Sequence, residues 1–173
     1  MIEDIEKLVI TQSLKNLNNL EVAFETYNNW GKVLSFIANE FYTQLFEPLH
    51  KQLANIDGVW KIEQRSGFNI YLTNTKWNDI EFGIGDYDAD RVHFFVKCSN
   101  DTKLELYAFI KEKLNGTANL NIWYQRLINP YNKWDKSFEG ILSVYKPDEL
   151  ILYATTKLVE LATVIEQYFI TKK

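Results

Sequence analysis

The sequence lacks most features of exported, membrane-spanning or disulfide-stabilised proteins. It holds a single cysteine, Cys98, which excludes an internal disulfide and favours a reducing compartment. Residues 1–6 are acidic where an export signal would be basic, and no apolar run approaches the roughly 18 residues of a membrane span. We therefore expect a cytoplasmic protein with no membrane-spanning segment.

Arginine is also scarce, because only Arg65, Arg91 and Arg126 occur among 19 basic residues. Bidentate recognition of guanine and phosphate relies on arginine, so sequence-specific reading of duplex DNA is not expected. The net charge of −4 further disfavours binding of polyanions over the whole surface. The partner that we expect is a protein.

Apolar and aromatic residues are plentiful, at 46% and 15% of the 173 residues. This composition supplies a hydrophobic core and excludes an intrinsically disordered chain. No repeat, linker or low-complexity tract divides the sequence. We predict one domain over residues 1–173.

Both ends of the chain show helical spacing of apolar residues. The first helix is predicted to end at Asn28-Asn29-Trp30-Gly31. A second helix follows, which Pro48 should kink or divide. The second helix carries its apolar stripe at Leu34, Ile37, Phe41, Leu45 and Leu49. The last helix starts at Pro147 and carries its stripe at Leu150, Ala154, Leu158, Leu161, Ile165 and Tyr168.

The period changes from 3.6 to 2 after Gly58, which indicates strands. A three-residue turn, Arg65-Ser66-Gly67, would pair Ile62 with Ile70 and Trp60 with Leu72. A two-residue turn would instead place charged residues opposite the apolar row, so we predict the longer turn.

A second hairpin pairs Phe82 with Phe94 and Asp79 with Lys97, around an exposed acidic loop at residues 85–90. The apolar side chains on the inner face of its two strands are Ile80, Phe82, Ile84, Val92, Phe94, Val96 and Cys98.

A middle helix follows, with Asp101 as N-cap and Asn115-Gly116 as stop signal. Residues 120–127 and 140–144 are read as two further strands. The fold class is therefore α+β, with an antiparallel β-sheet of four to six strands packed by long N-terminal and C-terminal helices plus one middle helix.

The hairpin loop has the beginning of a calcium-binding pattern. Asp86, Asp88 and Asp90 alternate as in a calcium loop, but Arg91 stands where that loop needs glycine and Lys97 where it needs glutamate. We interpret the segment as a solvated loop, with a weak cation site as the alternative.

No other group of residues predicts catalysis or metal binding. Asp101-Thr102-Lys103 has an acid-x-lysine spacing but opens a helix, where capping is the expected role. His50, His93 and Cys98 are too widely spaced to make a zinc site, and Cys98 lies in an inward-facing row as a small apolar residue. We predict no catalytic residue, no metal site and no cofactor.

Aromatic residues in loops are the best candidates for a contact surface. Tyr131 and Trp134 lie in the aromatic stretch after Pro130, and Trp77 and Tyr87 lie in the loops of the sheet. Tyrosine and tryptophan are favoured anchors at protein interfaces. The alternative is that this stretch folds back onto its own domain.

Three groups of residues carry a family resemblance: Gly67-Phe68-x-Ile70-Tyr71, the run from Trp77 to Gly85, and Trp134 before the last helix. In these the chain resembles the C-terminal accessory region of bacterial PD-(D/E)xK-superfamily nuclease-like proteins. The resemblance implies that the catalytic acids and lysine of such proteins precede the sheet. Residues 1–57 are helical in pattern and leave no room for that core, so no catalytic residue is carried over.

Two functions stay open. The first is a non-enzymatic binding or accessory domain, linked to a bacterial or phage nuclease or defence system. The second is a small metal-dependent hydrolase or nuclease that uses the carboxylates of Asp79, Glu81, Asp86 and Asp88. The last helix also has apolar residues outside its stripe, which would serve a homodimer or pack more deeply: Ile151, Leu152, Val159 and Val164.

Overall fold

The computed structural model describes most of the chain. The residues whose structure is described are 16–66, 69–88, 91–128, 131–132 and 148–172. The predicted strand at residues 140–144 lies outside these ranges. Contacts within the chain divide it into two units, residues 1–36 and residues 37–173. The prediction of a single domain stays a prediction.

Helix α2, Leu17–Leu53, runs without interruption through both expected break points. Our prediction of two helices divided at Asn28-Asn29-Trp30-Gly31 is therefore wrong. Glycine and asparagine each cost about 1 kcal/mol or less in a helix interior, and Asn29 and Ser35 donate side-chain hydrogen bonds to the carbonyls of Glu25 and Gly31. Pro48 does not divide the helix either.

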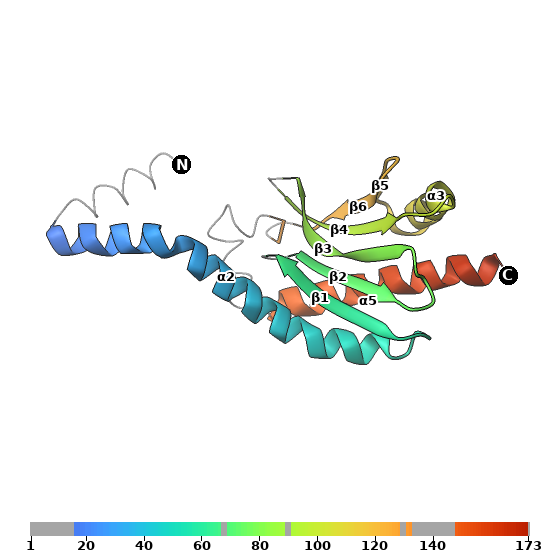
Figure 1. The fold of residues 1–173 in the computed structure, drawn as a ribbon, viewed down its shortest axis with the longest axis horizontal. Coiled ribbons are helices and arrows are strands. Elements are labelled where there is room, and N and C mark those ends of the chain that lie inside the picture. Colours follow the sequence, from blue (N-terminus) through green and yellow to red (C-terminus); the bar gives the residue numbers. More distant parts are fainter. Residues whose placement is uncertain (1–15, 67–68, 89–90, 129–130, 133–147, 173) are drawn as a thin grey trace. The chain divides into compact units, whose positions relative to one another are not determined.

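The unit of residues 37–173 is built on a six-stranded antiparallel sheet (Figure 1). The strand order is β1-β2-β3-β4-β6-β5, so only the last two strands depart from sequence order. The strands are β1 Trp60–Ser66, β2 Asn69–Asn74, β3 Ile80–Asp88, β4 Arg91–Cys98, β5 Thr117–Ala118 and β6 Trp123–Arg126. Together with its helices this sheet confirms the predicted α+β class.

Both hairpins pair two residues away from the predicted register. Ile62 faces Leu72 instead of Ile70, and Glu81 instead of Asp79 faces Lys97. Because side chains alternate with period two, a shift of two residues keeps every apolar side chain on the predicted face. The shift lengthens both ladders into the segments that were predicted to be turns. Strand β3 continues to Asp88 past a bulge, so the prediction of a six-residue acidic loop is wrong.

One face of the sheet is covered by the second half of α2, by α3, Lys103–Leu114, and by α5, Asp148–Thr171. The predicted apolar stripe of α5 is buried along its whole length, and Cys98 is buried as predicted. Thr102 rather than Asp101 is the N-cap of α3, and the Asn100 side chain accepts hydrogen bonds from the Thr102 amide and hydroxyl. Asn115 ends the helix in a left-handed conformation with φ 51°.

Within the described part of the chain, no helix is both long enough and apolar enough to cross a membrane.

Candidate functional site

Of the four predicted contact residues, Trp77 is a core residue. Its side chain is 2% exposed, and its ring packs at right angles to that of Trp60 with centroids 5.1 Å apart. Its indole Nε1 donates to the Glu166 carboxylate at 3.2 Å, which joins the β2–β3 connection to α5. Trp77 therefore offers a partner almost no surface.

Tyr131 is half-buried against its own unit. Its hydroxyl donates to Glu149 Oε2 at 3.2 Å, and its ring lies 5.6 Å from that of Tyr153, both on α5. Burial and then the contact with Glu149 raise the pKa of the Tyr131 hydroxyl. Trp134 and the side chain of Tyr87 lie outside the described residues.

The carboxylates of the alternative hydrolase reading do not converge where they are described. Asp79 is held near the start of β3 by Asn100, whose amide donates at 3.4 Å, and Glu81 forms an ion pair with Arg65. Among the described residues, no three His, Cys, Asp or Glu side chains are placed to share a metal ion. The side chains of Asp86 and Asp88 lie outside the described set.

The face of the sheet opposite the helices carries an aromatic row. Tyr71, Gly83, Phe95 and Tyr124 pair across four neighbouring strands, and the Arg65 guanidinium lies 4.0 Å from the Tyr71 ring centroid. Aromatic rings flanked by cations form a stacking surface for bases when they are exposed. Phe95 is only 3% exposed, so the centre of this row is not available to a base.

The far edge of the sheet is incomplete. Strand β5 pairs only with Trp123 and Tyr124, whereas its neighbour β6 stays paired with β4 as far as Arg126. The short β5 has a local cause. Asn115 turns the chain out of the extended conformation, and Gly116 lies against the indole of Trp123 so closely that a Cβ would collide with it.

The hydrogen-bonding pattern shows where the main chain of Arg126 points. The Leu127 amide donates to the Val92 carbonyl of β4 at 3.3 Å. In an antiparallel ladder the residues that bond to one neighbour alternate with those that bond to the other. The N–H and C=O of Arg126 are therefore directed away from β4, toward the line of β5, which has already ended.

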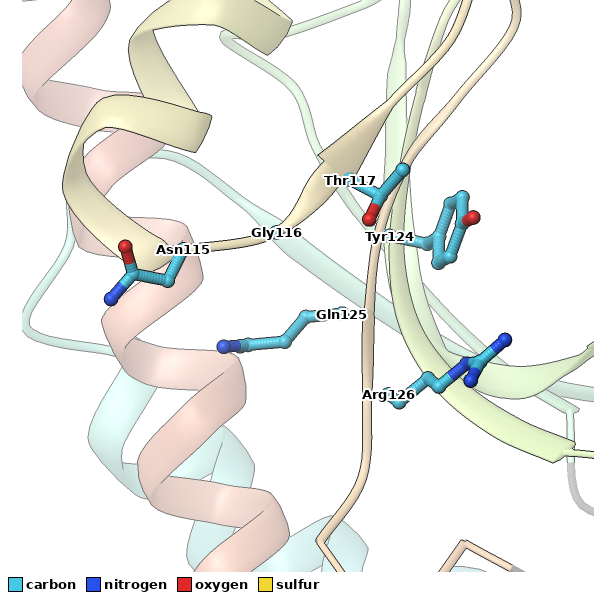
Figure 2. A pocket seen from close by; sticks show the side chains of 6 residues that line it. All are labelled: Asn115, Gly116, Thr117, Tyr124, Gln125 and Arg126. Carbon is cyan, nitrogen blue, oxygen red and sulfur yellow. The ribbon is translucent and has the colours of Figure 1, made fainter.

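A pocket of about 530 Å³ lies at this position. Its lining is polar and consists of Asn115, Gly116, Thr117, Tyr124, Gln125 and Arg126 (Figure 2). Figure 2 shows Tyr124 and Arg126 on one side of β6 and Gln125 on the other, as strand alternation requires. We call this pocket and the adjoining main chain of Arg126 the edge pocket.

Two side-chain contacts lie beside the edge pocket. Gln125 Nε2 donates to the Leu114 carbonyl at 2.9 Å, which ties β6 to the end of α3. The Tyr153 hydroxyl accepts from the Ile128 amide at 3.4 Å and closes the edge two residues beyond Arg126. The open edge is therefore one residue long.

Arg126 is the one charged side chain among the described residues that line the edge pocket. Its side chain is exposed, and no ion pair engages it among the described residues. The last turn of α3, next to the pocket, adds Lys111 and Lys113, of which Lys113 pairs with Glu112. None of the described residues that line the pocket is acidic.

Sequence reasoning missed the edge pocket. Residues 120–127 were predicted as one strand, which β6 confirms in part, but the two-residue β5 has no periodicity to detect. The available signal was the Asn115-Gly116 pair directly before Thr117-Ala118. It marks the end of a helix, but it does not indicate that the following strand is short.

Comparison of the chain with models of protein families, with curated proteins and with solved structures gives no match. The resemblance to PD-(D/E)xK-superfamily accessory regions therefore stays an expectation.

Proposed function

We propose that this chain is a non-enzymatic binding domain that takes an extended segment of a partner protein at the edge pocket. The observation that carries the proposal is that the N–H and C=O of Arg126 point away from β4, beside a polar pocket, and meet no strand in the described part of the chain. An unpaired strand edge is a template for an added strand, and peptide recognition often uses it.

The geometry allows one residue of the partner to exchange two hydrogen bonds with Arg126. Each such bond contributes about 0.5–1.5 kcal/mol after exchange with water, so the pair contributes about 1–3 kcal/mol. The rest of the binding free energy comes from side chains that enter the pocket of about 530 Å³. Weak, reversible binding is expected from so short an edge.

An accessory role beside a PD-(D/E)xK nuclease is compatible with such a domain, and it rests on the resemblance alone. The engaged state of Asp79 and Glu81 gives no support to the hydrolase reading.

The test is a display library of random linear peptides, selected on the wild-type protein and then measured on two variants at one position. Arg126→Pro removes the N–H that faces the pocket and leaves the bonds to β4 in place, whereas Arg126→Ala keeps that N–H. We expect selected peptides to bind the alanine variant and to lose binding to the proline variant.

Circular dichroism of the three proteins controls for folding. If no peptide is selected, or if the folded proline variant retains the selected peptides, strand addition at this edge is wrong.

A further inference from the structure

We infer that the segment bound at the edge pocket carries an acidic residue directly opposite Arg126. This inference rests on the proposed function, because it names the chemistry of the occupant that the proposal requires. It follows from the register of β5 and β6 and from the charges around the pocket.

The register decides which side chain of the occupant meets Arg126. Thr117 of β5 faces Tyr124 of β6, so an occupant that continues the line of β5 has one residue facing Arg126, two positions further on. Residues paired across an antiparallel ladder point to the same face of the sheet. The side chain of that occupant residue therefore lies beside the Arg126 guanidinium.

Strand β5 ends before it reaches the position opposite Arg126. If β5 continued, Asn115 would lie opposite Arg126. Asn115 instead stays in the C-cap of α3, because its backbone is left-handed and its N–H donates a hydrogen bond to the Lys111 carbonyl. The occupant residue thus takes a place in the sheet that no described strand fills.

The positive charge of Arg126 favours an acidic side chain on the occupant residue that faces it. Among the described residues of the lining, Arg126 alone carries a positive charge, and no described residue forms an ion pair with it. A directly opposed carboxylate gains from the guanidinium, and a directly opposed ammonium is repelled by it. The overall charge of −4 acts more weakly, because exposed charges beyond about 10 Å are screened at ordinary salt.

The experiment uses two blocked peptides, acetyl-Val-Thr-Glu-Thr-Val-amide and the same peptide with lysine at its centre. Their dissociation constants are measured by NMR titration of the backbone amides of residues 124–127 in the full chain. We expect the glutamate peptide to bind wild type about fivefold more tightly than the lysine peptide, a preference that declines as salt is added.

A charge-swap variant separates this inference from the proposed function. In Arg126→Glu the lysine peptide should become the tighter ligand, while Lys97→Glu, a matched charge reversal on β4, should leave the preference of wild type unchanged. Both peptides should fail to bind Arg126→Pro.

The outcomes are distinguishable. Equal binding of the two peptides to wild type, with loss in Arg126→Pro, overturns the acidic residue and leaves strand addition standing. No binding of either peptide overturns both. Sedimentation that shows a dimer lost in Arg126→Pro would make a second copy of the chain the occupant and would also overturn the inference.

Discussion

Pro48 provides a quantitative test of how α2 is built. The helix continues through this proline to Leu53, so the Gln44 carbonyl has no amide to accept from four residues on. Leu45 and Leu49 on either side are fully buried, which indicates that packing holds the helix together at this point. Replacing the proline should therefore raise the free energy of unfolding without changing the fold.

The expected gain from Pro48→Ala follows from two opposed terms. Proline costs about 3 kcal/mol relative to alanine inside a helix. Against this, proline restricts the unfolded chain and so contributes about 0.4–1 kcal/mol of stability. The variant should be more stable by about 2 kcal/mol, which raises the melting temperature by roughly 4–8 °C for a chain of this size.

Urea denaturation followed by circular dichroism measures the change. The control is Glu47→Ala, an exposed neighbour in the same helical turn, which should alter stability by no more than about 0.5 kcal/mol. If Pro48→Ala lowers the urea midpoint with an unchanged slope, the proline is a packing element of the fold, and the reasoning about α2 is refuted.

Three further predictions concern the core. Tyr107→Phe should cost about 1–3 kcal/mol in urea denaturation, because its hydroxyl accepts from the Cys98 amide at 2.8 Å and donates to the Asn121 carbonyl at 3.0 Å; a loss below about 0.5 kcal/mol would count against this. Gly116→Ala should cost about 1–3 kcal/mol because its Cβ meets the Trp123 indole, whereas Gly31→Ala, with nothing within 4 Å, should stabilise by up to about 1 kcal/mol; equal effects would refute the steric argument. Burial raises the pKa of Tyr107 and of Tyr153, so above about pH 10 the unfolded state binds fewer protons and the free energy of unfolding should fall as pH rises; a flat profile to about pH 11 would contradict it.

The fold class could be predicted from the sequence because the apolar periodicity is strong. The alternation in β3 and β4 identifies which side chains face the helices, and Phe82, Phe94 and Cys98 are buried as expected. Alternation cannot distinguish registers that differ by two residues, so both hairpin pairings were displaced by that step.

The candidate site could not be predicted, because it depends on where a strand stops. The helix-breaking effect of residues 28–31 was overestimated, because a long helix tolerates asparagine and glycine at a small cost in stability. Aromatic content pointed to Trp77 as a contact residue, although aromatic side chains serve cores as readily as interfaces.

The proposed function requires that the N–H and C=O of Arg126, which point away from β4, have no hydrogen-bond partner in the protein alone. Hydrogen exchange measured by NMR reports this for each amide. We predict rapid exchange for the amide of Arg126 between slowly exchanging amides of Gln125 and Leu127, which bond to β4. Slow exchange at all three positions would mean that the edge is already occupied, and it would contradict both the proposed function and the inference drawn from it.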